Sequence, residues 1–243
     1  SDRSALDTLL YACCLENAPY DKADDVFARL QESYFGWNEV RVTTVTELAE
    51  MMSELPDPRA AANSLKGCLQ GVFETEYSFE LEGLQKENLG KAVKKLEKYS
   101  ASPFAVAYVT QTALSGHAIP IDRAALDVLL VLGVISEAEA AKAQTPGMER
   151  AIPKSKGVEF GSLLHQLAVD FRASPFGTNP RKIMVEIEPS AKDRFPKRAS
   201  KKKAAKKTPA KATKKTGKKA ASKSKAAKKT SAKKTTAKKK TKV

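Results

Sequence analysis

The chain has 243 residues, with 43 lysines and arginines against 28 acidic residues, and its formal net charge is +15. No apolar run approaches the length of a membrane span, and the first residues show no signal-peptide pattern, which argues against a membrane protein. The three cysteines are Cys13, Cys14 and Cys68, and their spacing fits no zinc or iron–sulfur motif. Cys13 and Cys14 lie in an apolar stretch, so we expect reduced, packed thiols in a cytoplasmic protein.

Apolar residues recur at helical spacing through most of the first 175 residues. The predicted helices cover, in chain order, 2–15, 23–34, 44–55, 57–73, 89–99, 103–114, 123–132, a segment that begins at residue 136, and 160–171. Two short stretches, 40–45 and 183–187, alternate as strands do, but neither has a partner. The pattern therefore predicts an orthogonal all-α array.

Capping signals define several of these helix ends. Thr44 with Glu47, and Ser136 with Glu139, form the spacing of a capping box. Asp122 is placed to cap the helix that follows it, and Gly133 to close that helix in the left-handed conformation.

The charge divides the chain into two parts. Residues 197–243 hold 21 lysines, one arginine and no acidic residue, a charge of +22, which leaves −7 for residues 1–196. The first part is long enough for one large domain or two small ones. We therefore predict a helical domain over 1–196 and a separate basic tail over 197–243.

Common catalytic motifs are missing from the sequence. It contains no phosphate-binding loop, dinucleotide fingerprint or nucleophile elbow. The only histidines, His117 and His165, lie far apart in the sequence and make a weak case for a metal site. His165 lies beside the apolar face of the last predicted helix, and we expect it to be structural.

One segment resembles a known family. Residues Ile119-Pro120-Ile121-Asp122-Arg123, followed by Leu126, Leu129 and Leu132-Gly133, are similar to a segment of the helix–hairpin–helix DNA glycosylases related to endonuclease III. Residues Met148–Pro153, before a leucine-rich helix, resemble a further element of that family. The weaker similarity extends from Ala5 to Pro175. It implies a two-lobed, all-α fold of the helix–hairpin–helix type.

By this resemblance, Asp122 is the candidate catalytic residue. In the family the aspartate caps the helix after the hairpin and faces a nucleotide that has left the base stack. Its carboxylate can stabilise positive charge on the sugar, or orient a water, as the glycosidic bond breaks. An aspartate before a leucine-rich helix is also an ordinary N-cap, and both roles stay open.

The hairpin departs from the family pattern. Its two glycines, whose amides approach a DNA phosphate, align here with Ser100-Ala101-Ser102. We expect this turn, with the nearby Lys94, Lys95 and Lys98, to contact the DNA backbone. The Schiff-base lysine of bifunctional members aligns with Phe104, so no lysine-based lyase activity is expected.

Two further features of these glycosylases, the iron–sulfur loop and an inserted glutamine, are not found in the sequence. The four-cysteine iron–sulfur loop would follow Phe171, but residues 172–177 contain no cysteine, so we expect no cluster, metal or other cofactor. The glutamine that many relatives insert beside the flipped base is not identifiable around residues 14–17.

The tail resembles the C-terminal tails of linker histones. Its apolar residues are alanines and one terminal valine, so it cannot bury enough surface to offset the entropy of ordering, and we expect disorder. Without aromatic side chains, it should bind phosphates non-specifically and with steep salt dependence. Double-stranded DNA is the predicted partner, RNA is an alternative, and a membrane is not expected because no amphipathic element is present.

The tail lysines predicted to contact nucleic acid gather in doublets and triplets. They are Lys201, Lys202, Lys203, Lys206, Lys207, Lys214, Lys215, Lys218, Lys219, Lys228, Lys229, Lys233, Lys234, Lys238, Lys239 and Lys240.

The sequence predicts one of two functions, and in both the protein works on the chromosome or nucleoid. The first is a monofunctional base-excision DNA glycosylase that the tail anchors to DNA. The alternative is a non-catalytic DNA-binding protein that kept the glycosylase fold. The altered hairpin favours the second, and the Asp122 segment favours the first. A less favoured reading is a protein-interaction module that the tail delivers to nucleic acid.

Overall fold

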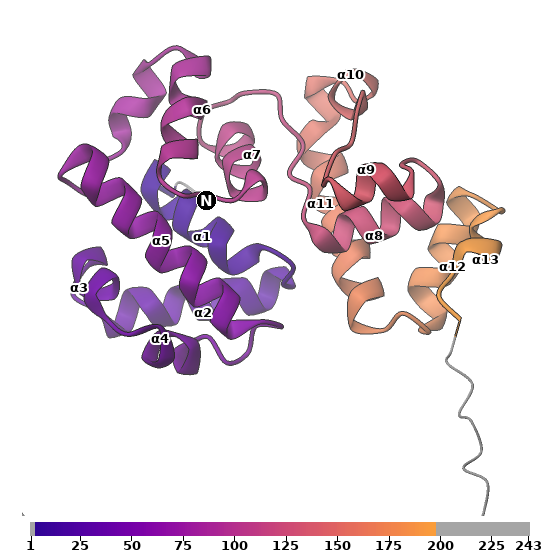
Figure 1. The fold of residues 1–243 in the computed structure, drawn as a ribbon, viewed down its shortest axis with the longest axis horizontal. Coiled ribbons are helices and arrows are strands. Elements are labelled where there is room, and N and C mark those ends of the chain that lie inside the picture. Colours follow the sequence, from indigo (N-terminus) through magenta and orange to yellow (C-terminus); the bar gives the residue numbers. More distant parts are fainter. Residues whose placement is uncertain (1–2, 198–243) are drawn as a thin grey trace, which may run out of the picture. The chain divides into compact units, whose positions relative to one another are not determined.

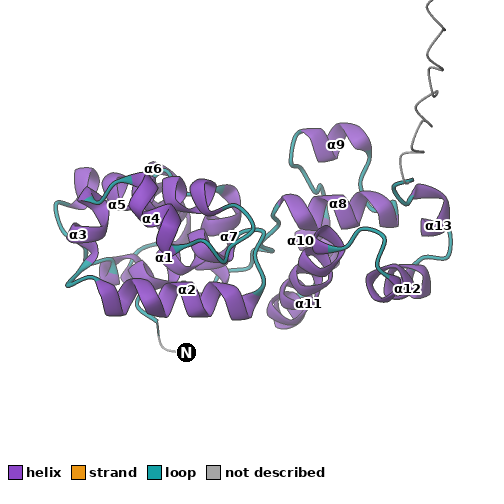
Figure 2. Ribbon diagram, turned by 90° about the horizontal axis from the view of Figure 1, so that it is seen from below, coloured by secondary structure: helices purple, strands orange, loops and turns teal. Residues whose placement is uncertain are grey.

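The computed structural model describes residues 3–197, and all regular structure in this range is helical (Figures 1 and 2). The elements are α1 (Ala5–Leu15), α2 (Tyr20–Ser33), α3 (Trp37–Val42), α4 (Val45–Met51), α5 (Pro58–Glu76), the 3-10 helix η1 (Glu82–Lys86), α6 (Leu89–Lys98), α7 (Pro103–Thr112), α8 (Arg123–Leu132), α9 (Glu137–Ala141), α10 (Met148–Ala151), α11 (Lys154–Ala173), α12 (Thr178–Ile187) and α13 (Ala191–Arg194). The predicted all-α class is confirmed. None of the described helices is both long enough and apolar enough to cross a membrane. The tail prediction concerns residues that, apart from Lys197, lie outside the described range.

Helix ends follow the capping signals of the sequence. Thr44 and Ser136 each form a complete capping box with the glutamate three residues on. Asp122 caps α8, and Gly133 ends it with a φ of 75°, in the left-handed region that glycine tolerates. These predictions are confirmed because a cap depends only on residues within one turn of the helix.

The two stretches that alternate as strands do form no strand in the described structure, in line with the predicted all-α class. Residues 40–42 belong to α3, and residues 183–187 form the end of α12. A strand needs a neighbour for its backbone hydrogen bonds, whereas a helix satisfies them internally. Each segment turns one main side chain inward, Val40 in α3 and Met184 in α12, and both are fully buried.

The first core surrounds α1. This helix contacts α2, α5, α7 and η1, and nearly all of its residues are buried. Cys13 and Cys14 lie in this core as free thiols, and the sulfur of Cys13 is 3.6 Å from that of Cys68 in α5. The predicted reduced, packed cysteines are confirmed.

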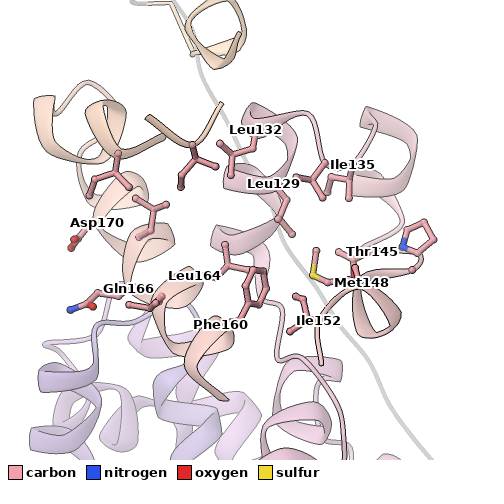
Figure 3. Close-up of a pocket in the computed structure, with 18 residues that line it drawn as sticks. Leu129, Leu132, Ile135, Thr145, Met148, Ile152, Phe160, Leu164, Gln166 and Asp170 are labelled. Atoms are coloured by element: carbon pink, nitrogen blue, oxygen red, sulfur yellow. The ribbon is translucent and has the colours of Figure 1, made fainter. Parts of the chain in front are cut away.

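The second core is built on α8 and α11, which pack against each other, with α9, α12 and α13 around them. Its central side chains include Leu126, Leu129, Ala168 and Met184. On one side this core opens into an apolar groove that is lined by residues of α8, α10, α11 and α12 (Figure 3).

Close packing fixes the turn between α6 and α7. A Cβ atom on Gly71, in α5, would lie 2.7 Å from the main-chain carbon atoms of Tyr99. Only glycine allows this approach. The Tyr99 hydroxyl also donates a 2.6 Å hydrogen bond to Glu76. Because both ends of this contact lie on α5, the α6–α7 hairpin is held firmly on the first core.

Candidate active site

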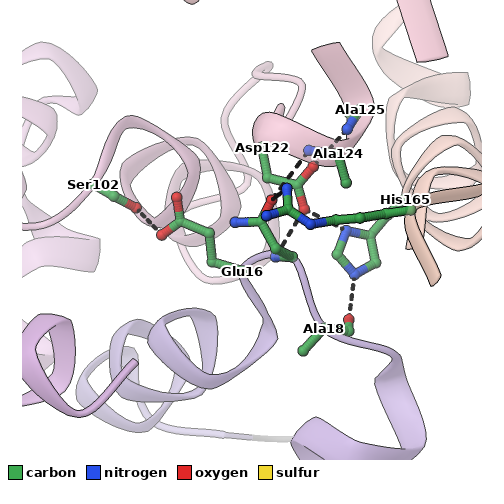
Figure 4. Close-up of polar contacts among 9 residues, drawn as sticks. Glu16, Ala18, Ser102, Asp122, Ala124, Ala125 and His165 are labelled. Atoms are coloured by element: carbon green, nitrogen blue, oxygen red, sulfur yellow. Dashed lines mark hydrogen bonds and ion pairs between the residues drawn. The ribbon is translucent and has the colours of Figure 1, made fainter. Parts of the chain in front are cut away.

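Asp122 lies at the N-terminus of α8 with a fully bonded carboxylate (Figure 4). One oxygen accepts the N–H of Ala125 at 2.8 Å, and the other accepts the N–H of Asn17 at 2.9 Å. The residue is only 2% exposed. Burial by itself raises the pKa of this carboxyl. The contact with His165 and the hydrogen bonds from the two backbone N–H groups lower it by more, so the pKa lies below its ordinary value.

His165, on α11, forms a buried ion pair with Asp122. Its Nδ1 is 3.2 Å from the Asp122 carboxylate, although the contact is not aligned as a hydrogen bond. Its Nε2 is 2.8 Å from the carbonyl oxygen of Ala18, which can only accept. Both ring nitrogens therefore face acceptors. His165 thus ties α11 to both α8 and the α1–α2 connection.

Asn17 connects the same elements through an unusual backbone conformation. Its φ is 61°, in the left-handed region, and its side-chain oxygen accepts the N–H of Ala124 at 3.1 Å. Arg172 donates to that same oxygen at 3.1 Å. Asn17 therefore binds the first turn of α8 with its main chain and its side chain.

Phe104, which the sequence resemblance aligns with the lysine of bifunctional glycosylases, packs against His165. Its ring stacks on His165 with centroids 5.8 Å apart, and on Tyr108 at 6.0 Å. The ring of Tyr20 meets the ring of His165 edge-on, with centroids 5.1 Å apart. These rings border a cavity of about 110 Å³, into which Gln111 and Ser162 also bring polar groups.

The hairpin turn keeps the glycine-like backbone without the glycines. Ser100 has a φ of 58°, in the left-handed region that the family's glycine suits. Ser102 caps α7, and its hydroxyl accepts the N–H of Ala105 at 3.1 Å. Pro103 has no N–H. In the turn itself, the N–H groups of Ala101 and Ser102 form no hydrogen bond with another described residue, so the predicted contact with a phosphate stays a prediction.

Glu16, which the sequence reading did not select, shares this turn. The Ser102 hydroxyl donates to its carboxylate at 2.7 Å (Figure 4). Glu16 is half-buried at the end of α1, directly before Asn17. Burial raises its pKa above the ordinary value, and the negative charge of Asp122 adds to the rise, while the Ser102 hydrogen bond opposes it.

The three hairpin lysines have different surroundings. Lys94 and Lys98 are exposed on α6. Lys95 instead pairs with Glu87 at 2.6 Å and with Glu76 at 3.7 Å. Lys94 and Lys98 are therefore the better placed to reach a phosphate. The predicted tail lysines lie outside the described residues.

The structure brings together residues that are distant in the sequence. Asn17 follows α1, Asp122 precedes α8 and His165 belongs to α11, yet Asp122 contacts both of the others. Glu16, the neighbour of Asn17 in the chain, is hydrogen-bonded to Ser102 instead. Only Asp122 and the hairpin carried a local sequence signal. The others could not be found by spacing, because the contacts span up to 155 positions.

The residues present do not fit a cysteine-ligated cluster. The sequence has only three cysteines, and all three are buried in the first core. Arg181, in α12, lies in the part of the chain that follows α11. Its guanidinium lies 4.6 Å from the Phe195 ring centroid and donates to the carbonyl oxygens of Pro175 and Pro196. Aromatic and cation–π packing thus closes this end of the second core.

Comparison with known proteins shows the fold. No protein-family model and no curated protein matches the sequence. A solved structure of a trapped endonuclease III–DNA covalent intermediate is 16% identical, with a TM-score of 0.54, over 81% of this chain and 88% of that chain. A non-covalent endonuclease III–DNA complex is 19% identical, with a TM-score of 0.53, over 80% and 87% of the two chains. The predicted all-helical fold of the endonuclease III type is thereby confirmed.

Proposed function

We propose that this protein binds double-stranded DNA and hydrolyses the N-glycosidic bond of a base, without lysine-based lyase chemistry. The observation that carries the proposal is the carboxylate of Asp122, kept ionised by its lowered pKa at the first turn of the helix after the hairpin. The fold is similar to that of endonuclease III, which has been solved on DNA. A carboxylate at this place suits a reaction in which positive charge develops on a sugar.

The two carboxyl groups of the site suit different roles. Asp122, ionised, would stabilise the charge that develops on the sugar as the bond between C1′ and the base nitrogen breaks. Glu16, whose pKa is raised, would give its proton to the departing base, which takes the bonding electron pair. Water then adds its oxygen to C1′ and returns a proton to Glu16. The products are a free base and an abasic sugar.

The cavity beside His165 supports the same reaction class. Phe104, Tyr108 and Tyr20 give it aromatic walls that suit a planar base, and Gln111 adds an amide. Phe104 cannot form a Schiff base, so the abasic sugar would stay in an uncleaved strand after the base is released.

A second candidate function is non-catalytic DNA binding. The observation that favours it is the burial of Asp122, whose two carboxylate oxygens are already occupied by backbone donors and His165. In either function, the basic residues 197–243 would supply most of the non-specific affinity, for RNA as well as DNA, and keep the protein on the nucleoid of the cytoplasm.

A panel of duplexes, each with one damaged or mismatched base, tests the proposal. We expect the unmodified protein to release at least one of these bases. Asp122→Asn and Glu16→Gln should each slow release by about 100-fold or more, because charge stabilisation and proton transfer are lost. Both variants should still bind duplex, since asparagine can cap α8 and glutamine can accept from Ser102.

Asp57→Asn is the matched control. Asp57 caps α5 in the same manner, with its carboxylate accepting the N–H of Ala60 at 3.0 Å, but it lies outside the site. Its variant should release the base at the normal rate. If the unmodified protein releases no base from any duplex while it still binds them, the non-catalytic function holds instead.

A further inference from the structure

The apolar groove of the second core is a large open surface. It has a volume of about 830 Å³. Several of its aliphatic side chains are largely exposed, with Leu163 and Ile187 at 60%, Val134 at 59% and Ile183 at 46%. Exposed apolar area of this kind is unusual on a protein that acts alone and marks an interaction surface. A small ligand would leave such walls in water, so a larger occupant is required.

The walls of the groove are helical stripes. Leu163, Leu167 and Asp170 follow one another along α11 at spacings of four and three residues, and Ile183 and Ile187 repeat along α12 at a spacing of four. Such rows form the ridges between which a third helix packs. The described residues offer no strand edge, and the backbone of both walls is bonded within its own helix. The occupant must therefore satisfy its own backbone groups, as a helix does.

One edge of the groove is polar and acidic. Gln166 and Asp170 lie along it (Figure 3). Among the described residues that line the groove, Asp170 is the only charged one, and no cation of the described chain pairs with its carboxylate. A basic side chain on the occupant would complement it.

We infer that this groove binds an amphipathic helix of another protein, with an aliphatic ridge facing α11 and α12 and a lysine or arginine beside Asp170. The chain's own residues 198–243 cannot provide the ridge, because they contain no leucine, isoleucine, methionine or aromatic residue. The inference does not depend on catalysis, and it would make the helical domain an adaptor that brings a partner to DNA.

Two synthetic helical peptides probe the groove by fluorescence anisotropy with the full chain. Both peptides are alanine-rich and carry leucines along one face of the helix. Lysines lie beside the leucine face in one peptide, and glutamates take their place in the other. Asp170→Lys should weaken binding of the lysine peptide and strengthen binding of the glutamate peptide. Each change in affinity should be about two- to fivefold, as expected for an exposed charge pair. Since all variants share residues 197–243, attraction of the tail for glutamates cancels in the comparison.

A lysine placed in the groove supplies the second arm. Leu163→Lys should weaken binding of the lysine peptide by about tenfold or more, because an apolar contact is lost. Val42→Lys is the matched control, since Val42 is 62% exposed on α3, outside the groove, and binding should not change. Thermal unfolding confirms that both variants fold.

Three results would overturn the inference. Equal peptide binding by Leu163→Lys and Val42→Lys would remove the groove as the binding site. Identical responses of the two peptides to Asp170→Lys would remove the basic flank. A dimer of the unmodified chain in sedimentation, dissociated by Leu163→Lys, would make a second copy the occupant.

Discussion

At the scale of single residues, the ion pair of Asp122 and His165 decides both stability and the character of the site. His165 contacts Asp122 at 3.2 Å and Ala18 at 2.8 Å, and the side chains of His165 and Asp122 are almost completely buried. A buried charge that loses its partner is costly, because no water replaces the partner. The contacts of His165 agree with the prediction that it is structural. They also place it directly against the candidate catalytic carboxylate.

His165→Leu should lower the free energy of unfolding by about 3 kcal/mol at neutral pH. Asp122 has a lowered pKa, so its contribution to stability is present above the unfolded pKa of about 4 and is lost as the pH falls through the folded pKa. The difference between variant and unmodified protein should therefore shrink in acid. Urea unfolding at several pH values measures it.

His117→Leu is the control for that measurement. His117 is less buried and contacts the carbonyl oxygen of Glu149, with no carboxylate partner among the described residues. Its loss should cost about 1 kcal/mol, as for an ordinary hydrogen bond. An equal cost for both variants, or a difference that does not change with pH, would contradict the ion-pair account.

At the scale of elements, close backbone contact holds the hairpin in place. Gly71 is a helix residue whose Cβ position is already filled by the main chain of Tyr99. The hairpin turn that follows Tyr99 then presents Ser102 to Glu16. The position of the candidate proton donor thus depends on a glycine that lies in another helix.

Gly71→Ala should destabilise the protein by about 1–3 kcal/mol, because a rigid backbone cannot move away from the new methyl group. Gly67→Ala, in the same helix, is the matched control. There a Cβ meets only the Ser100 side chain at 4.0 Å, so alanine should stabilise α5 by about 0.5–1 kcal/mol. Calorimetric melting compares the two, and the same sign for both variants would contradict this account.

At the scale of the whole molecule, charge separates two tasks. Residues 1–196 sum to −7, so the helical domain by itself is poorly suited to tight binding of a polyanion, whereas residues 197–243 carry +22. A tethered cationic segment raises the local concentration of the domain near DNA. The turn at Ser100–Ser102 would then need to supply only local contacts.

Truncation after Pro196 should sharply reduce duplex binding at low salt and flatten its salt dependence, because fewer counterions are released. Fluorescence anisotropy over a salt series measures both quantities. A chain that carries a neutral glycine–serine segment of the same length in place of 197–243 controls for tail length and should behave like the truncation. Unchanged binding by the truncated chain would refute the anchoring role.

The sequence by itself determined the helical class, most helix positions, the capping boxes and the electrostatic split, because these depend on periodicity and on neighbours within one helical turn. It also pointed to Asp122, since a cap and a family-like segment coincide there. The structure alone decided that 40–42 belong to α3 and 183–187 to α12, that His165 contacts Asp122 and Ser102 contacts Glu16, and that α8, α11 and α12 leave an apolar groove open. Those features depend on contacts between segments that are distant in the sequence. Such contacts form only in the folded chain, where apolar side chains are buried and backbone N–H and C=O groups find hydrogen-bond partners.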